Sequence, residues 1–170
     1  EVDIDSQASR TSIMGGKVTD EWQTVFPLLA RDYAMHVQAE NAVRAAAGQA
    51  ELPLDETLTE ALQVSPRNII QKTHWPNIDL IGAQLNLYWA EFQVPVWRMQ
   101  MRNWALWDAL GNALTETGIV NDYDIILLDT PPALGYLTIN ALSAADILLV
   151  PLGASFLEFD STGRFFDMIY

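Results

Sequence analysis

Cysteine is absent from this sequence of 170 residues, which excludes disulfides, thiolate metal sites, iron–sulfur clusters and cysteine nucleophiles. Long hydrophobic runs are absent as well. The longest uncharged run covers 16 residues, 130–145, and contains Pro131, Pro132 and Gly135, so it cannot form a membrane-spanning helix. We therefore expect a cytoplasmic protein that makes no membrane contact.

Basic residues are scarce: 9 Lys and Arg stand against 22 Asp and Glu, giving a formal net charge of -13. The acids are spread evenly, with eleven up to Glu60 and eleven from Asp79 onward, so no acidic tail accounts for the total. Nucleic-acid affinity comes mainly from cations that neutralise phosphates. DNA contact would therefore need a local basic patch or a segment outside these 170 residues.

The fraction of charged residues is low, at 18%, while 50% of the residues are hydrophobic. That balance excludes a disordered polyelectrolyte and is typical of a folded globule. A length of 170 residues fits one domain with a sizeable core. All six tryptophans lie between residues 20 and 118, where core and interface packing is favoured over a base-stacking platform because there are few basic residues around them.

The first two thirds of the chain divide into two segments. Residues 1–19 are predicted to be the end of a β-strand followed by a polar loop. Residues 20–118 are predicted to be mostly helical, with long helices over 20–47 and 98–117 that end at Gly48 and Gly118.

The last segment, residues 119–170, has the most regular pattern. It predicts a strand over 124–129, a helix over 136–144, a strand over 147–150 and a further helix from Glu158. Strands without polar alternation are buried on both faces, as in a parallel sheet covered by helices. We therefore predict an α/β fold.

Acidic residues end two of the predicted strands. Asp129 follows a buried strand, at the position where open α/β sheets bind ligands and where phosphate-handling enzymes hold Mg²⁺ through water; the alternative is an Asp that caps the following turn. Asp3 and Asp5 lie two residues apart on an extended segment, so they share one side of it. A carboxylate there can orient an attacking water, and the alternative is a solvated acidic stretch.

Two ordered motifs carry a family resemblance. Residues 3–9 read DIDSQAS and residues 123–142 read YDIILLDTPPALGYLTINAL. Together they resemble the ParA family of deviant-Walker partition ATPases, with greatest similarity to the RepA-like plasmid partition branch. The resemblance continues to Pro151 and implies a P-loop NTPase fold of the ParA/MinD type, in which residues 20–50 would be a helical insertion.

Carried over residue by residue, the resemblance implies a role for each matching position. Asp129 would be the Walker B acid near Mg²⁺, Asp5 the switch I carboxylate that activates water, and Asp3 a support for the magnesium shell. The turn from Thr130 through Pro131 to Gly135 would sense the γ-phosphate. Pro151 would lie near the adenine of ATP.

The sequence departs from the family in two places. Ser6 stands where the family usually has proline, and the glycine-rich phosphate loop with its lysines is absent from these residues. Its only lookalike, at Gly15-Gly16-Lys17-Val18, has Thr11 and Val18 at positions that call for Gly and for Ser or Thr. We therefore expect a domain truncated at both ends that does not bind ATP well by itself.

The function expected from the resemblance is an ATP-driven partition switch that works as a homodimer with Mg²⁺. Its partners would be a centromere-binding partition protein and DNA, the latter reached through segments outside this chain. Two alternatives are a non-catalytic interaction fragment and a cell-division-positioning ATPase of the same superfamily. The histidines, His36 and His74, have no neighbours at metal-ligand spacing.

Overall fold

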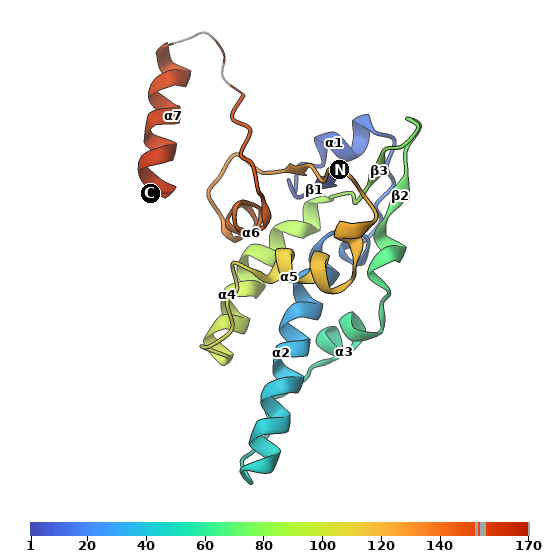
Figure 1. Cartoon of the computed structure of the whole chain (residues 1–170), viewed down its shortest axis with the longest axis vertical. Coiled ribbons are helices and arrows are strands. Elements are labelled where there is room, and N and C mark those ends of the chain that lie inside the picture. The colour runs from blue at the N-terminus through green and yellow to red at the C-terminus, as the bar shows by residue number, and fades with distance from the viewer. Residues whose placement is uncertain (152, 154–155, 170) are drawn as a thin grey trace.

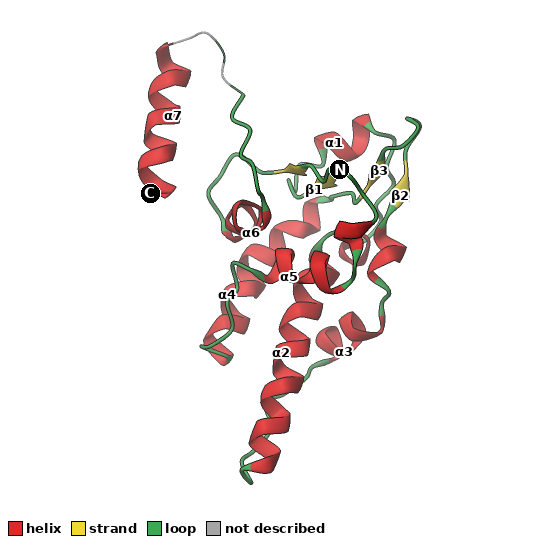
Figure 2. Ribbon diagram, viewed as in Figure 1, coloured by secondary structure: helices red, strands yellow, loops and turns green. Residues whose placement is uncertain are grey.

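A computed structural model describes residues 1–151, 153 and 156–169. Helices make up most of this part, and the short strands gather at one end of the molecule (Figure 2). The strands are β1 (Val2–Asp3), β2 (Gln71–Lys72), β3 (Asp79–Leu80) and β4 (Leu128–Asp129). The α-helices are α1 (Ser9–Ile13), α2 (Phe26–Ala46), α3 (Glu56–Gln63), α4 (Ala90–Gln100), α5 (Ala109–Glu116), α6 (Tyr136–Ala144) and α7 (Phe156–Ile169). The 3₁₀ helices are η1 (Glu21–Gln23), η2 (Pro66–Ile69), η3 (Leu85–Trp89) and η4 (Ile119–Asn121).

Strand β1 lies between β4 and the end of β3. Val2 and Asp3 pair in parallel with Leu128 and Asp129. On the other side the amide of Asp3 donates to the carbonyl oxygen of Ile81 at 2.9 Å, next to a parallel bridge between Val2 and Ile81. Strands β2 and β3 form a second, antiparallel two-stranded sheet, and the bridge between Val2 and Ile81 places it beside the β1-β4 sheet. This parallel centre is that of the α/β fold that the sequence predicts.

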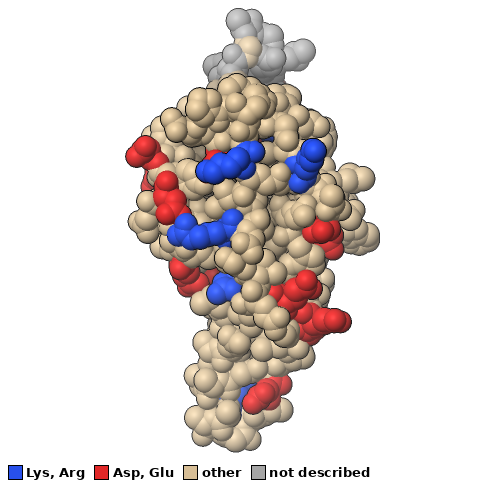
Figure 3. Space-filling model, turned by 90° about the vertical axis from the view of Figure 1, so that its right-hand side faces the viewer, with Lys and Arg blue, Asp and Glu red and all other residues tan. Residues whose placement is uncertain are grey.

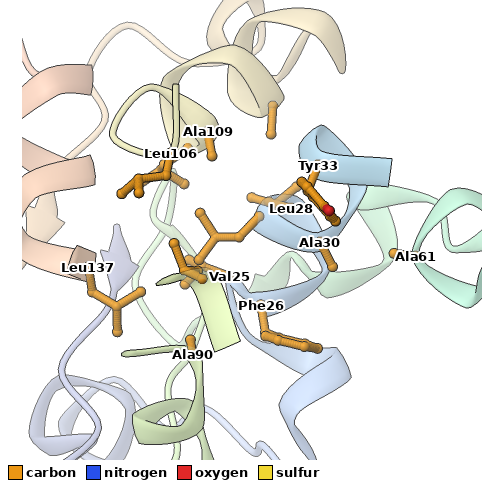
Figure 4. Packing of buried hydrophobic residues seen from close by; sticks show 14 of the residues in the cluster. Val25, Phe26, Leu28, Ala30, Tyr33, Ala61, Ala90, Leu106, Ala109 and Leu137 are labelled. Atoms are coloured by element: carbon orange, nitrogen blue, oxygen red, sulfur yellow. The ribbon is translucent and has the colours of Figure 1, made fainter. Parts of the chain in front are cut away.

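Helix α2 forms the centre of the hydrophobic core (Figure 4). Buried side chains from its first half and from Val25 face residues of four other helices: Ala61 of α3, Ala90 of α4, Ala109 of α5 and Leu137 of α6. Beyond Val37 the helix carries no buried side chain and extends away from the body (Figure 1).

Two of the six tryptophans are fully buried against α2. The Tyr33 ring stacks on Trp97 with centroids 5.2 Å apart and meets Trp104 edge-on at 4.8 Å. The prediction of core packing is therefore correct for these two, whereas Trp75, Trp89 and Trp107 are 40–69% exposed.

The prediction of one helix over residues 98–117 is wrong. Helix α4 ends at Gln100, Met101 has an extended backbone, and α5 begins only at Ala109. The break lets the indole of Trp104, which follows Met101 in the connection, reach the core, where it is 0% exposed. Burial of a large aromatic side chain outweighs the modest helix propensity of this segment.

The predicted helix over residues 20–47 begins later than expected. Asp20 accepts a hydrogen bond from the amide of Trp22 at 3.0 Å and so caps η1, after which Thr24 is extended. Helix α2 then starts at Phe26, with Pro27 in its first turn, where the missing amide proton of proline costs nothing. The predicted end is correct, because Gly48 has a φ of 68° just beyond α2.

The two predicted strands of the last segment are shorter than expected. Of residues 124–129 only Leu128–Asp129 form a strand, and residues 147–150 form none. Ile147 and Leu149 are 79% and 76% exposed, and no strand in the described ranges pairs with them. A strand needs a neighbour for its backbone groups, and without one this segment has no regular secondary structure. None of the described helices combines the length and apolar character needed to cross a bilayer.

Buried Asp32 gives the core a pH dependence. Its Oδ2 atom accepts a hydrogen bond from Trp104 Nε1 at 2.7 Å. Burial raises the pKa of Asp32 above 3.8, although the Trp104 hydrogen bond and His36 oppose the rise. An acid whose pKa is higher in the folded than in the unfolded state stabilises the fold less and less as the pH rises from the unfolded-state pKa through the folded-state pKa. The contribution of Asp32 to the free energy of unfolding should therefore fall above about pH 4. We expect Asp32→Asn to gain stability over wild type between about pH 4 and about pH 7 in urea unfolding. An equal difference at both pH values would contradict this assignment.

Candidate functional site

Three carboxylates meet where β1 and β4 end. Asp3 and Asp129 are direct partners in the parallel register, and Asp5 follows Asp3 by two residues. Burial raises the pKa of Asp129, and the negative charges of Asp3 and Asp5 raise it further. The two motifs that the sequence singles out thus meet at one edge of the sheet, the carboxyl end of its parallel strands.

Asp3 is fully buried and holds the loop that follows β1. Its Oδ2 atom accepts hydrogen bonds from the amide of Thr11 at 2.8 Å and from Thr11 Oγ1 at 2.7 Å. Its Oδ1 atom accepts from the amide of Asp5 at 3.2 Å. Thr11 Oγ1 in turn accepts from the amide of Ala83 at 2.7 Å, so one network joins β1, α1 and the chain beyond β3.

Asp5 opens a tight turn. Its Oδ1 atom accepts a hydrogen bond from the amide of Gln7 at 3.0 Å, and its carbonyl oxygen accepts from the amide of Ala8 at 2.8 Å. Ala8 has a φ of 54°, a left-handed conformation that residues other than glycine adopt rarely. The backbone around Asp5 is therefore held in one defined shape, which supports a positioning role for the loop.

Arg10 is part of the site and was missed by the sequence reasoning. Its Nε atom lies 3.4 Å from Asp129 Oδ2 and 4.0 Å from Glu1 Oε1, and it lowers the pKa of Asp129 against the effect of burial. The Arg10 side chain is 55% exposed, so the pair contributes little to stability. The sequence feature that could have indicated Arg10 is that it is a single basic residue five positions after Asp5.

Glu91 connects the turn after β4 to α4 and was also missed. Its carboxylate accepts hydrogen bonds from the amides of Tyr136 at 2.6 Å and Leu137 at 3.0 Å, so it caps the N-terminus of α6. Thr138 Oγ1 donates to the carbonyl oxygen of Ala133 at 2.7 Å. The turn from Thr130 to Gly135 is thus fixed at its far end by a residue 45 positions away in the sequence.

Gly135 is required for this cap. A Cβ atom on Gly135 would lie 2.5–2.7 Å from the carboxyl atoms of Glu91. We expect Gly135→Ala to displace the carboxylate and to cost about 0.5–2 kcal/mol of stability, the usual value of an N-terminal cap. Urea unfolding of Gly135→Ala, Glu91→Ala and the double variant tests this. The double variant should lose less than the sum of the single changes, and additive losses would show that Gly135 and Glu91 act separately.

The segment Gly15-Gly16-Lys17-Val18, which resembles a phosphate loop, contains its glycines for structural reasons. A Cβ atom on Gly16 would lie 2.6 Å from Leu80 Cδ2, and Gly15 has a φ of 75°. Both glycines are therefore needed by packing and by backbone conformation. Lys17 lines a concavity of about 550 Å³ together with residues of the 6–12 segment, and its own amide donates to Gln71 Oε1 at 3.0 Å.

The carboxylates at the ends of β1 and β4 are of the kind that binds Mg²⁺ when a nucleotide supplies further ligands. No three Asp, Glu, His or Cys side chains in the described ranges form a complete metal site. Mg²⁺, however, usually binds one or two carboxylates and completes its shell with water and substrate phosphates. Asp129 offers one carboxylate at this edge, where the negative charges of Asp3 and Asp5 act on it and the Nε atom of Arg10 lies 3.4 Å from its Oδ2 atom.

Of the other residues that the sequence predicts for the site, two lie beside the carboxylates and one does not. Thr130 and Pro131 follow β4 directly and so lie beside the carboxylates, with Thr130 exposed and Pro131 half-buried. Pro151 is exposed and follows residues 147–150, which have no regular secondary structure, and none of the described contacts joins it to the carboxylates.

Comparisons with known proteins give one family model and several relatives that match this chain. Residues 1–169 match the family AAA_31, described as an AAA domain. The chain is 36% identical over 133 residues to the putative replication protein A of Sinorhizobium fredii, covering 71% of this chain and 31% of that protein. It is 34% identical over 100 residues to protein SopA of Escherichia coli, covering 59% and 26%. It is 27% identical over 169 residues to the sporulation initiation inhibitor protein Soj of Bacillus subtilis, covering 99% and 51%.

A solved structure has the same fold. Cobyrinic acid a,c-diamide synthase from Mycobacterium smegmatis, with bound ADP and magnesium, superposes with a TM-score of 0.68 at 24% identity, covering 99% of this chain and 52% of that one. The same enzyme with a bound ATP analogue and magnesium gives a TM-score of 0.62 at 26% identity. The chain thus spans between about a quarter and a half of the length of these relatives.

Proposed function

This chain belongs to the AAA_31 family, among the ParA-like and SopA-like partition ATPases, and we propose that it is part of a protein that hydrolyses ATP to ADP to drive DNA segregation. The observation that carries the proposal is the parallel pairing of Asp3 with Asp129, with Asp5 two residues beyond. That arrangement brings the acids of two family motifs to the sheet edge where α/β folds bind ligands.

Each acid has a distinct role in this proposal. Asp129 holds Mg²⁺ largely through water, and Asp5 orients and activates the attacking water. Asp3 supports the magnesium shell indirectly, because its two oxygens hold the loop that carries Asp5. Bound Mg²⁺ would neutralise phosphate charge.

The flanking segments complete the proposed nucleotide site. Thr130 and Pro131 belong to a turn that responds to the γ-phosphate, and Pro151 lies near the adenine. Residues 1–19 supply the switch I part and residues 119–170 the Walker B part, with the mostly helical residues 20–118 between them. Glu91 anchors the responsive turn to α4 by capping α6.

The partners that we propose are inferred from the family and from the negative net charge of the chain. We propose a homodimer that works in the cytoplasm with a centromere-binding partition protein. DNA would be bound through segments outside this chain, because its net charge is -13. On the face in Figure 3 the Lys and Arg side chains stand apart, with Asp and Glu around them, which supports this assignment.

The 170 residues alone should not bind Mg-ATP, because they contain no glycine- and lysine-rich phosphate loop. They should self-associate, since Ile125 and Leu127, just before β4, are 76% and 51% exposed and β4 pairs with β1 alone among the described strands. Calorimetry with Mg-ATP and light scattering after size exclusion test both points. Micromolar Mg-ATP binding to a monomer would overturn them, and a longer protein that contains a phosphate loop yet binds no ATP would overturn the proposed function.

A further inference from the structure

A regular apolar seam runs along the exposed side of η3 and α4. It consists of Leu85, Trp89, Phe92, Val96 and Met99, which are 45–79% exposed. Trp89, Phe92, Val96 and Met99 are three, four and three residues apart along α4, the spacing that lets one helix pack its side chains against a second helix. Leu85 lies just before them, at the start of the 3₁₀ helix η3. Helix α4 lies at the outside of the helical body (Figure 1).

The seam is larger than a scatter of single apolar residues. Tyr88 and Trp89 each contact Phe92, with ring centroids at 5.1 Å and 5.9 Å. These three rings are each more than half exposed and together present roughly 200–400 Å². With the aliphatic residues added, the seam reaches the size of patches that mark interaction sites on monomeric proteins.

The opposite side of α4 holds the seam in place. Val94 and Trp97 are 1% exposed, and Trp97 stacks on Tyr33 of α2. Glu91 binds the first amides of α6. The exposed side chains therefore stand on a helix that is already ordered, which lowers the entropy cost of binding a partner.

Charge defines the kind of partner. Glu91 is the only acid between Gln84 and Trp107, and both of its oxygens are occupied by α6. Arg98 lies in the last turn of α4, where it donates to the carbonyl oxygen of Met101 at 3.4 Å and lies 5.9 Å from the centroid of the Trp107 ring. Arg102 is exposed and follows the extended Met101, beyond the end of the helix. Neither arginine forms an ion pair with a described residue. An apolar strip that ends near two arginines without a carboxylate partner among the described residues is thus embedded in a chain of net charge -13.

We propose that this seam binds one amphipathic helix of a partner protein, whose apolar residues repeat at three- and four-residue spacing and whose flanking carboxylates meet Arg98 and Arg102. A second copy of the same seam offers no free carboxylate for these arginines, so symmetric pairing leaves them unmatched. An anionic membrane would be repelled by the 22 acids of the chain, and two arginines contribute only about 2 kcal/mol of attraction against that. The proposal is independent of ATP hydrolysis.

The test uses the 170-residue chain and two labelled helical peptides of about 20 residues. Both carry leucine at the seam spacing, with Glu at the flanking positions in one and Lys in the other, and binding is followed by fluorescence anisotropy. The net charge of -13 favours the Lys peptide everywhere else on the surface. A preference of about tenfold for the Glu peptide would therefore report Arg98 and Arg102.

Variants locate the binding. Trp89→Glu should abolish it, whereas Val43→Glu, at a position 65% exposed on α2, is the matched control and should leave it unchanged. Exchanging both Arg98 and Arg102 for Glu should reverse the preference to the Lys peptide. Circular dichroism confirms that each variant is folded.

Several results would overturn the proposal. One is the absence of saturable binding of the Glu peptide, and another is a preference of the wild-type chain for the Lys peptide. A third is a wild-type dimer that is lost in Trp89→Glu, which would show that a second copy covers the seam. Co-sedimentation with phosphatidylserine vesicles that is lost in Trp89→Glu would assign the seam to a membrane instead.

Discussion

Alanine in place of Asp5 is expected to lower ATP turnover by about 10²- to 10⁴-fold in a full-length protein that contains this chain, while ATP binding is retained. The physical reason is that Asp5 would activate water, and that its side chain takes no part in a phosphate cradle. Its only described side-chain hydrogen bond is the one from the amide of Gln7. The measurement is steady-state hydrolysis at saturating ATP together with calorimetric binding of an ATP analogue.

Asp129→Ala is the companion variant and should behave differently. Because Asp129 is the acid proposed to hold Mg²⁺, its loss should raise the magnesium concentration needed for nucleotide binding as well as lower turnover. Asp124→Ala, which removes an exposed acid five residues earlier, is the matched control and should leave both quantities unchanged. Hydrolysis by Asp5→Ala at the wild-type rate would overturn the role of Asp5.

The sequence allowed the sheet centre and its acids to be predicted because their signals are local. An apolar, β-prone run followed by an acid predicts the end of a parallel strand, and two such ends in one parallel sheet must lie at the same edge. The prediction that this run is buried on both faces was wrong, since Ile125 and Leu127 are 76% and 51% exposed. Helix α6 was predicted with correct bounds for the same reason, since its segment lies between Gly135 and an extended Ala145. These features need no knowledge of distant contacts.

The features that sequence reasoning missed depend on partners far away in the chain. The break between α4 and α5 exists because Trp104 packs on Tyr33, which is 71 positions earlier. Glu91 caps a helix that begins 45 residues later, and Arg10 pairs with Asp129 across the sheet edge. Helical spacing and propensity carry no information on such pairs, so tertiary packing decided them.

Asp3 is expected to be the most sensitive polar residue of the site for stability. Replacing it by alanine leaves three donors without this acceptor: the buried amide and hydroxyl of Thr11 and the half-buried amide of Asp5. Each orphaned buried donor costs about 1–3 kcal/mol, so the two buried donors alone should make Asp3→Ala lose about 2–6 kcal/mol or fail to fold. Asp3→Asn should lose about 2–4 kcal/mol, because its amide group would face donors in place of one oxygen.

Thr11 provides the variants that keep this prediction testable. Thr11→Val preserves shape but removes the hydroxyl that links Asp3 to the amide of Ala83, so it should cost about 1–3 kcal/mol in urea unfolding. Thr11→Ser keeps the hydroxyl and should lose only about 1 kcal/mol for its missing methyl group. If Thr11→Val and Thr11→Ser unfold at the same urea concentration, the hydrogen-bond network does not hold the loop. If they differ as expected, the Asp3–Thr11 network is what fixes the position of Asp5, and losses of turnover in Asp3 variants have to be corrected for lost folding before any are assigned to magnesium.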